Sequence, residues 1–310
     1  MAEPESILCM VSIRRTVIGD VWRWNPHAAI DSNRVPSRKF DIEEFNRLCW
    51  KPVKGAVVAI IPARYCSARL PGKPLLPLAG IPMIVHVLRR AASASLVARA
   101  FVATDDRRIA DAVADHGGEA VLTSESARSG TDRVAEAAAG IDAEIIVNVQ
   151  GDEPLIDPGT IDAAVQLLID AETDISTTSE PMSSAEDVFN PNVVKVLTNP
   201  EGQALYFSRS PIPYIRTDNG VSLMETLGRD AGMLGNYRKH SGLYCYRKNV
   251  LMRLARMEVS ALEQLEGLEQ LRALECGYRI KVVRVDHQSI GVDTEQDYHR
   301  VKKILEENIT

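Results

Sequence analysis

Residues 57–75 read VVAIIPARYCSARLPGKPL, and this stretch decides the fold that we predict for the chain. It begins with an unbroken apolar run, residues 57–61. Such a run is typical of a strand that is buried on both faces of a parallel sheet. Pro62 cannot donate a ladder hydrogen bond, so we expect the strand to end there.

The loop after this strand carries three cations, Arg64, Arg69 and Lys73, with Ser67 among them. Open α/β sheets bind ligands at the carboxyl ends of their strands, and Arg forks and Lys point charges suit phosphate oxygens. A solvated basic loop is the plainer interpretation, but the buried strand before it favours a polyphosphate site. We expect Lys73 to point at phosphate rather than into the core, so its removal should leave the melting temperature of the ligand-free protein nearly unchanged.

Strand-like and helix-like segments alternate after this loop. Apolar runs at residues 100–104, 119–123 and 144–149 indicate strands, and segments with helical spacing of apolar residues separate them. The alternation predicts an α/β fold with a doubly wound, mostly parallel, Rossmann-like sheet. Right-handed crossovers then place the strand-end loops on one side of the sheet.

The second half of the chain is less regular. Residues 193–197, 204–208, 242–246 and 279–285 indicate strands and add a mixed β region. The Gly-rich, polar residues 218–236 suggest a mobile loop over a site. Leucines recur along one predicted helix, residues 262–274, on which we expect Glu263 and Glu266 to be exposed. Thr294 and Asp297 predict a capping box at the start of a final helix.

Two acidic turns are candidates for metal binding. Asp152 and Glu153 follow the predicted strand 144–149, and Asp293 precedes the final helix. Mg²⁺ prefers carboxylate and phosphate oxygens, which makes Asp152 and Asp293 candidate ligands beside a phosphate loop. The plainer alternatives are a solvated turn at Asp152 and a helix cap at Asp293.

The segment SGTDR, residues 129–133, opens another predicted helix. Backbone N–H groups at a helix start favour anions or carbonyl oxygens. The alternative is a plain N-cap without a ligand.

Composition excludes several classes of protein. Of the 310 residues, 45% are hydrophobic and 25% charged, as is ordinary for a globular protein. The net charge of -6 argues against a nucleic-acid binder, and no apolar run approaches the roughly 20 residues that span a bilayer. The 5 cysteines are widely spaced and form no C-x-x-C pair, which argues against disulfides or a zinc site and favours the cytoplasm.

Two regions differ in character. Residues 1–55 hold all three tryptophans and show little periodicity, whereas residues 56–310 carry the strand, loop and acidic motifs and form one predicted catalytic domain. The first region could be an extension that folds over the domain, a disordered tail, or sequence upstream of the real start.

The motif PAR-Y-x-S-x-RLPGKPL resembles the opening of the 3-deoxy-manno-octulosonate cytidylyltransferase family, and the resemblance continues from about Ala56 to the last helix. Cys66 and Ala261 depart from the usual small residue and proline, without loss of chemistry. The resemblance implies a nucleotide-diphospho-sugar transferase-like fold and a homodimer. It also implies transfer of CMP from CTP to 3-deoxy-D-manno-octulosonate (Kdo), which releases pyrophosphate and activates the sugar for lipopolysaccharide synthesis.

The resemblance further implies a role for each candidate residue. Arg64, Lys73, Asp152 and Asp293 would be catalytic, with Mg²⁺ held by the two aspartates. CTP would be bound by Arg64, Ser67, Arg69, Lys73, Ser129, Gly130 and Arg133. The sugar would be bound by Gln150, Arg209, His240, Tyr244, Glu269 and Gln270. His240 is equally open to a structural role, and Glu269 and Gln270 to an exposed helix face.

Other functions remain as alternatives. Sialic acid cytidylyltransferases have Gly-Gly-Ser and a Lys where this chain has Tyr65-Cys66-Ser67 and Arg69. Hexose-1-phosphate nucleotidyltransferases favour a Gly-rich loop, which is absent from this motif. A GT-A-like glycosyltransferase would share the nucleotide fold and the acidic motif, and a non-enzymatic nucleotide-binding module would not need the full set of charges. The 8-amino analogue of Kdo is an alternative substrate.

Overall fold

The computed structural model describes residues 56–66, 70–216, 221–287 and 289–307. The predictions for residues 1–55, Ser67 and Arg69 lie outside these ranges and stay predictions. Within them, no helix is long and apolar enough to cross a membrane.

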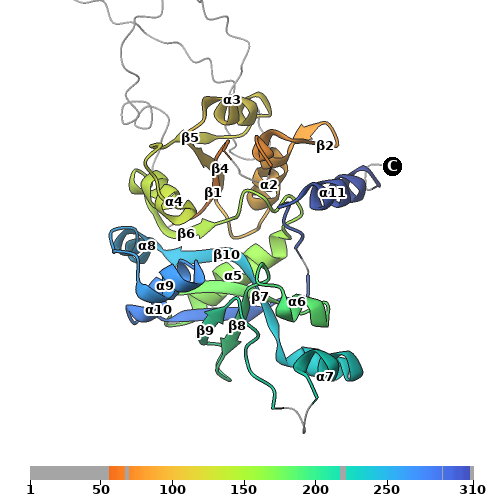
Figure 1. Ribbon diagram of the computed structural model, residues 1–310. Coiled ribbons are helices and arrows are strands. Elements are labelled where there is room, and N and C mark those ends of the chain that lie inside the picture. Colours follow the sequence, from red (N-terminus) through yellow and green to blue (C-terminus); the bar gives the residue numbers. More distant parts are fainter. Residues whose placement is uncertain (1–55, 67–69, 217–220, 288, 308–310) are drawn as a thin grey trace, which may run out of the picture.

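A mixed sheet forms the centre of the described chain (Figure 1). Its main path runs β11–β7–β10–β6–β1–β4–β5, and β8 joins it beside β10 and pairs with β9. Only β10 runs antiparallel to its neighbours along this path. The predicted doubly wound, mostly parallel sheet with a mixed β region is therefore confirmed. The strands are β1 (Ala56–Ala63), β4 (Arg99–Thr104), β5 (Ala120–Leu122), β6 (Ala143–Asn148), β7 (Ile175–Pro181), β8 (Lys195–Thr198), β9 (Ala204–Ser208), β10 (Arg238–Arg247) and β11 (Ile280–Arg284).

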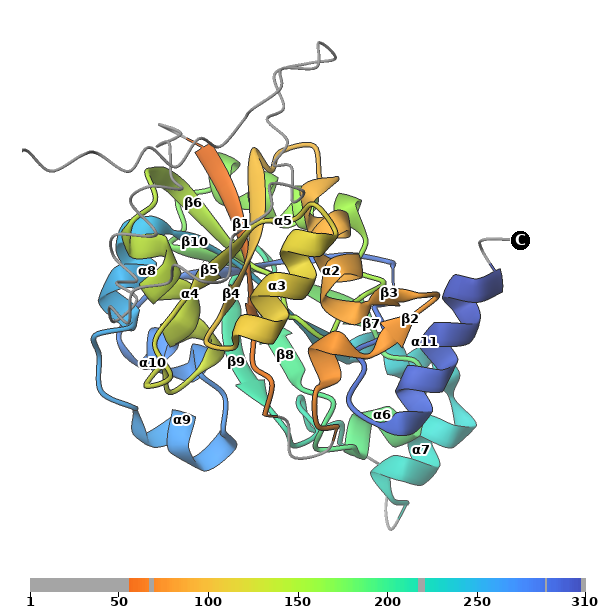
Figure 2. The same ribbon diagram turned by 90° about the horizontal axis from the view of Figure 1, so that it is seen from above.

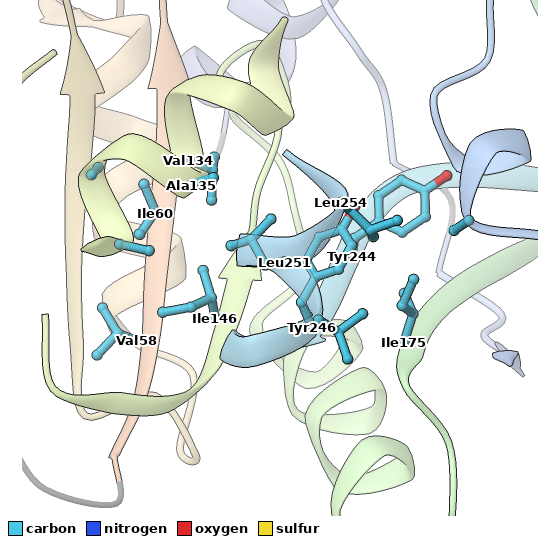
Figure 3. Packing of buried hydrophobic residues seen from close by; sticks show 14 of the residues in the cluster. Val58, Ile60, Val134, Ala135, Ile146, Ile175, Tyr244, Tyr246, Leu251 and Leu254 are labelled. Atoms are coloured by element: carbon cyan, nitrogen blue, oxygen red, sulfur yellow. The ribbon is translucent and has the colours of Figure 1, made fainter. Parts of the chain in front are cut away.

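Helices cover both faces of the sheet, and β1 shows why its sequence is continuously apolar. Val58 and Ile60 pack toward α4 (Gly130–Ala139) and α8 (Lys248–Leu254), as Figure 3 shows. Ala59 and Ile61 face the opposite cluster, which is built from α2 (Met83–Ala92), α3 (Arg107–Asp115) and α5 (Pro158–Asp170). Figure 2 shows α2 and α3 together over the sheet. Because both faces are buried, every residue of the run had to be apolar.

The strand does not end at Pro62, as the sequence predicted, but continues to Ala63. Pairing of β1 with β6 stops at Ile60, whereas pairing with β4 continues to Ala63. The carbonyl of Pro62 lies close to Gly151, on the β6 side. Since the N–H and C=O of one strand residue point the same way, the missing N–H falls on the side where the ladder has already ended.

The sequence pattern did not predict β7, ISTTSEP, because its residues are polar. Nevertheless Ser176, Thr177 and Thr178 are fully buried. Their hydroxyls have partners in the sheet or in the helix that packs on it. Thr177 Oγ1 donates to the carbonyl of Leu243 in β10 at 2.6 Å, and Ser176 Oγ donates to that of Ala164 in α5 at 2.6 Å. A buried hydroxyl with a partner costs little, so a polar strand can lie at the centre of the sheet.

The predicted mobile loop at residues 218–236 is wrong for its described part. Helix α7 (Leu223–Arg229) and the 3₁₀ helix η2 (Ala231–Asn236) occupy it. Ser222 and Asp230 cap the two helices. Leu227 packs into a small apolar cluster with Val188 of α6 (Ala185–Phe189) and Tyr237. Capping and this satellite core order a segment whose composition suggested a loop.

The predicted single helix at residues 262–274 is also wrong, because it is two helices, α9 (Ala261–Glu266) and α10 (Gln270–Glu275). Gly267 ends α9 in the left-handed conformation at φ +62°. Glu263 is buried and pairs with Arg272 at 2.8 Å rather than facing solvent. Glu266 accepts from Ser208 Oγ at 2.6 Å and from the Arg209 N–H at 2.9 Å. Both glutamates are structural.

The remaining elements support the loops at the sheet edge. They are the 3₁₀ helix η1 (Lys73–Leu75), the hairpin strands β2 (Pro77–Leu78) and β3 (Ile81–Pro82), and the final helix α11 (Glu295–Glu307). The predicted capping box at α11 is confirmed, since Thr294 N–H donates to Asp297 Oδ2 at 2.8 Å and Asp297 N–H to Thr294 Oγ1 at 3.2 Å.

Gly151 generates a prediction about the edge where β1 and β6 end. A Cβ there would lie 2.7 Å from the Pro62 carbonyl oxygen, which is backbone and cannot move alone. We expect Gly151→Ala to lower the free energy of unfolding by about 1–3 kcal/mol through overpacking. The matched control is Gly228→Ala in α7, where a Cβ meets nothing within 4 Å. It should stabilise by about 0.5–1 kcal/mol. Urea unfolding of both variants checks the opposite signs; a neutral Gly151→Ala would contradict the close approach.

Candidate active site

Three chain segments meet at the ammonium group of Lys73. Its Nζ donates to Asp152 Oδ2 at 2.9 Å, to the Val292 carbonyl at 2.8 Å and to Asp293 Oδ1 at 3.2 Å. The Lys73 side chain is only 14% exposed, whereas those of Asp152 and Asp293 are 32% and 49% exposed. We call these four residues the cation cluster. Its three oxygens surround one positive charge at the carboxyl edge of the sheet, where α/β folds bind ligands.

Backbone contacts explain why these segments meet. The Gly151 turn follows β6 and lies against the end of β1, close to the Pro62 carbonyl. The Val292 N–H donates to the Asp152 carbonyl at 2.8 Å, which ties the segment before α11 to the same turn. Gly72, at φ +68°, starts η1 and directs the chain so that Lys73 reaches both aspartates. Backbone contacts of the Gly151 turn and of Val292 thus position Asp152 and Asp293.

In this structure, which holds no ligand, the Lys73 ammonium lies at the sheet edge rather than in the core, and its three donors meet protein oxygens. Its role toward phosphate and the effect of its removal on stability stay predictions. The sequence could not reveal these contacts, because Asp293 lies 220 residues away from Lys73.

Two arginines predicted to bind CTP are hydrogen-bonded to other protein groups. Arg64 donates to the Ala127 carbonyl at 2.5 Å, beside the SGTDR segment. Arg133 is fully buried and donates to Thr123 Oγ1 and, at 2.5 Å, to Asp105 Oδ2. A buried guanidinium that is paired with a carboxylate ties the start of α4 to the turn after β4, so in this structure Arg133 contacts protein groups.

A second group joins residues that were predicted for different substrates. Ser129 caps α4 and donates its hydroxyl to Glu269 Oε2 at 3.1 Å. Glu269, Gln270, Thr131 and Tyr244 line a cavity of about 20 Å³ between α4 and α10. The Tyr244 hydroxyl is buried and has no hydrogen-bond partner among the described residues. A buried hydroxyl without a partner is costly, and the cavity beside it has room for about one water molecule.

The side chains of three further candidates contact protein groups in other elements. Gln150 Nε2 donates to the Gly242 carbonyl at 3.1 Å. Arg209 donates to the carbonyls of Glu266, Pro191 and Gly267, and so fixes the break between α9 and α10. His240 Nε2 hydrogen-bonds Thr177 Oγ1 at 3.0 Å, and its ring meets Phe207 edge-on. For His240 the geometry favours the structural alternative.

Burial controls the charge of His240 and of Glu153. Burial lowers the pKa of His240 to about 3, so the ring is neutral at physiological pH. Burial, and then the nearby Asp152 and Glu180 carboxylates, raise the pKa of Glu153 to about 7. Glu153 accepts from Ser289 Oγ at 3.1 Å, whereas Asp152 contacts Lys73. The two neighbouring acids therefore have different partners: Asp152 contacts Lys73, and Glu153 contacts Ser289.

The cation cluster fits Mg²⁺ by the chemistry of its donors. Asp152 Oδ2 and Asp293 Oδ1 already coordinate one cation, the Lys73 ammonium. Among the described residues, no group of three or more His, Cys, Asp or Glu side chains could hold a metal. Mg²⁺ does not require one, because it commonly binds one or two carboxylates and completes its shell with substrate phosphates and water.

The sequence did not identify several groups that shape this site. The Asp105 carboxylate, the Val292 and Ala127 carbonyls and the Tyr65 ring all contact candidate residues or their neighbours. Carbonyl partners leave no sequence signal. Asp105 had a weak one, since it follows the strand β4. A hollow of about 260 Å³ between α4 and α8 is lined by none of the candidate residues, but its lining includes Ala127, whose carbonyl accepts from Arg64.

The neutral His240 predicts a pH dependence of stability. Its folded pKa of about 3 lies below the ordinary value of 6.5, so the unfolded chain takes up the proton first. The contribution is fully present above pH 6.5 and declines as the pH falls toward 3. We expect the stability advantage of wild type over His240→Gln to shrink by about 2 kcal/mol between pH 7 and pH 5, measured by urea unfolding. An advantage that is independent of pH would contradict a buried, neutral ring.

Comparisons with known proteins identify the family of the chain. The cytidylyltransferase family model matches residues 58–281. The chain is 50% identical over 252 residues to the 3-deoxy-manno-octulosonate cytidylyltransferase of Trichlorobacter lovleyi, across 81% of this chain and 99% of the relative. The relative of the same name from Geobacter sulfurreducens is 51% identical over 250 residues, across 80% and 99%.

Solved structures give the same result. A structure of CMP:2-keto-3-deoxy-manno-octonic acid synthetase complexed with CTP superimposes with a TM-score of 0.73 at 39% identity, across 82% of this chain and 100% of that one. A putative glucose-1-phosphate thymidylyltransferase from Bacillus anthracis shares the fold alone, with a TM-score of 0.57 at 14% identity over 81% and 95% of the two chains. The chain belongs to the 3-deoxy-manno-octulosonate cytidylyltransferase family.

Proposed function

We propose that the protein transfers CMP from CTP to the anomeric hydroxyl of Kdo and releases pyrophosphate. The observation that carries this proposal is the cation cluster, in which Asp152 and Asp293 surround one cation at the end of β1 and β6. The names of the relatives and the CTP complex of the solved homologue support both substrates.

The cationic segment after β1 would bind the triphosphate. Arg64, Arg69 and Lys73 would neutralise the β- and γ-phosphates, and the Ser67 hydroxyl would hydrogen-bond CTP; Ser67 and Arg69 lie outside the described residues. Lys73 must exchange its carboxylate contacts for phosphate oxygens to do so. Ser129 and Gly130 start α4 next to the carbonyl that Arg64 contacts, and their backbone would face the cytidine.

Asp152 and Asp293 would hold Mg²⁺. When bound there, the metal would supply positive charge to the phosphate oxygens and lower the pKa of a coordinated hydroxyl. Fixed charges of this kind contribute several kcal/mol to catalysis. The two aspartates need no movement of backbone for this task, because one cation already lies between them.

The second group of residues would bind the sugar acid. Tyr244, Glu269 and Gln270 line one cavity of about 20 Å³, so side chains around it would have to move to admit the sugar, and Tyr244 offers a hydroxyl without a protein partner among the described residues. Arg209 uses three of its five N–H groups for carbonyls, so a sugar carboxylate would share the others. Gln150 would orient the sugar from the β6 side, while His240 supports Tyr244 by ring contact.

The reaction is an in-line displacement. The anomeric oxygen forms a bond to the α-phosphorus as the bond from that phosphorus to the pyrophosphate oxygen breaks. The hydroxyl proton passes to solvent. The residues of the cation cluster lower the barrier by orienting the triphosphate and neutralising charge, and no separate protein base is required.

We also propose the setting in which the enzyme works. Its product would supply activated Kdo for lipopolysaccharide synthesis in the cytoplasm, where CTP is available. The free thiols of Cys66, Cys245 and Cys276 suit a reducing compartment. The expected homodimer rests on the family resemblance.

The direct test is to incubate the protein with CTP, Mg²⁺ and Kdo, the 8-amino analogue or sialic acid, and to measure pyrophosphate. We expect release with Kdo. Asp152→Asn and Asp293→Asn should each lower turnover by orders of magnitude, and the double variant should be little worse, because residues that act as a unit are non-additive. Near-normal turnover of Asp293→Asn would reduce that residue to a helix-capping role. Pyrophosphate release with none of the sugar acids would refute the proposal.

The Lys73 geometry gives a second test that does not need the sugar. Lys73→Met removes the ammonium that contacts both Asp152 and Asp293, so we expect the free energy of unfolding to fall by about 1 kcal/mol, a value that allows for the partial exposure of the two carboxylates. Mn²⁺ should restore this loss, and should raise the melting temperature of Lys73→Met more than that of wild type, because metal and ammonium compete for the same oxygens.

The matched control is Arg64→Met, which removes one cation from the same segment but leaves both carboxylate contacts intact. Its response to Mn²⁺ should equal that of wild type. If both variants gained equally from Mn²⁺, the effect would be long-range charge alone and Lys73 would not share the metal position. Thermal unfolding with and without Mn²⁺, in the absence of CTP, measures all three proteins.

A further inference from the structure

Arg64 and Lys73, the two described cations after β1, flank a short loop that a backbone hydrogen bond between Gly72 and Tyr65 closes. We call this closed loop the clasp, and the residues from Arg64 to Lys73 the phosphate segment. Arg64 directly precedes Tyr65, and Lys73 directly follows Gly72. The Gly72 N–H donates to the Tyr65 carbonyl at 3.1 Å, so the chain closes on itself between the two cations. A Cβ on Gly72 would lie 3.2 Å from Tyr65 Oη and 3.3 Å from its Cζ, which shows that the ring rests against Gly72. The position of Tyr65 therefore sets the separation of Arg64 and Lys73.

Arg108 holds the Tyr65 ring from a different element. Its guanidinium carbon lies 3.4 Å from the ring centroid, the geometry of a cation–π contact. Arg108 belongs to the first turn of α3, which follows β4, the neighbour of β1 in the sheet. The contact thus ties the phosphate segment after β1 to the turn after the adjacent strand.

Asp106 fixes the direction of Arg108. Arg108 Nε donates to Asp106 Oδ1 at 3.0 Å and Nη2 to Oδ2 at 2.6 Å, a bidentate fork. Asp106 also caps α3, because its Oδ1 accepts the Arg108 N–H at 2.9 Å, and its own N–H donates to Thr104 Oγ1 at 3.1 Å. The hydrogen bond from Arg108 lowers the pKa of Asp106, so the carboxylate stays charged. A guanidinium held by a fork on a helix cap has little rotational freedom.

This arrangement has no evident role in the core. The Arg108 side chain is 59% exposed, so it adds little to packing. The positive charge of Arg108 is also paired with the Asp106 carboxylate, so Arg108 is not an unpaired surface cation. What it contacts is the ring on which the spacing of Arg64 and Lys73 depends.

We propose that Arg108, oriented by Asp106, is a positioning residue that holds Tyr65 on Gly72 and thereby presets Arg64 and Lys73 for a triphosphate. The proposal rests on the proposed function for the identity of that ligand. Presetting lowers the ordering cost of binding, which affects affinity for CTP more than the chemical step. Arg108 need not touch the nucleotide.

The first readout needs no substrate. Cys66 is exposed and follows Tyr65, so its alkylation rate reports on the clasp, and the exposed Cys276 provides an internal reference in the same protein. Peptide-resolved mass spectrometry separates the cysteines. We expect Arg108→Met, Asp106→Asn and Tyr65→Leu to label about fivefold faster at Cys66, the factor that one cation–π contact supplies, without a change at Cys276. Tyr65→Phe keeps the ring and should retain the wild-type rate.

The second readout is kinetic. Arg108→Met should raise KM for CTP about fivefold and leave kcat within twofold. Arg108→Met combined with Tyr65→Leu should be no worse than either single variant, because both remove one contact. Arg89→Met removes an exposed arginine from α2 and controls for net charge. It should change neither readout.

Two outcomes would overturn the proposal. If Arg108→Met raised KM but left Cys66 labelling unchanged, Arg108 would contact the nucleotide directly. If labelling were unchanged and KM normal, the contact would have no positioning role. Should Tyr65→Leu fail to fold, Arg108→Met and Asp106→Asn carry the test alone. Failure of CTP turnover in the wild-type protein would refute the proposed function. The labelling experiment needs no substrate, so it would still test whether Arg108 holds Tyr65.

Discussion

The attraction of two carboxylates for one ammonium is the interaction on which the functional edge of the fold depends. Asp152 ends the β6 segment, Asp293 precedes α11, and Lys73 starts η1 after β1. Two carboxylates that face the same point repel each other, so a cation between them lowers the cost of bringing their side chains together. Lys73 supplies it from within the chain. The same repulsion explains why the position suits Mg²⁺, since carboxylate oxygens that face one point favour a cation there.

Rigid backbone contacts make this arrangement reproducible. Gly151 allows the turn after β6 to approach the Pro62 carbonyl, and Pro62 itself lies where its missing N–H faces no ladder partner. The Val292 N–H to Asp152 carbonyl bond brings the last segment to the same place. Charge then acts on side chains whose Cα positions are already set, which limits the entropy that the ion pairs must overcome.

The sequence predicted the fold where the apolar pattern was strong and failed where polar residues were buried. The run at residues 57–61 fixed the central strand, and the alternation after it gave the mostly parallel sheet. The strand β7 was not predicted, because serines and threonines whose hydroxyls bond to buried protein groups look like loop residues in a sequence. At the site, the acidic turns and the cationic loop were recognisable. Their pairing across 220 residues, and carbonyl partners such as Val292, leave no local pattern.

The candidate side chains are mostly committed to protein partners, and this constrains how ligands can bind. Lys73, Arg64, Arg209 and Gln150 each donate to a protein oxygen, so a substrate that takes these donors replaces one hydrogen bond with another. Such an exchange is worth about 1 kcal/mol or less for each neutral contact. Triphosphate charge changes the balance, because charge-assisted bonds are roughly twice as strong as neutral ones. The Tyr244 hydroxyl differs from all of these: it lacks a partner among the described residues, so a ligand group that bonded it would replace no protein contact and would remove a cost of about 1–3 kcal/mol. Affinity for the nucleotide should therefore come from charge, and discrimination among sugar acids from the few positions where a hydroxyl completes a buried polar group.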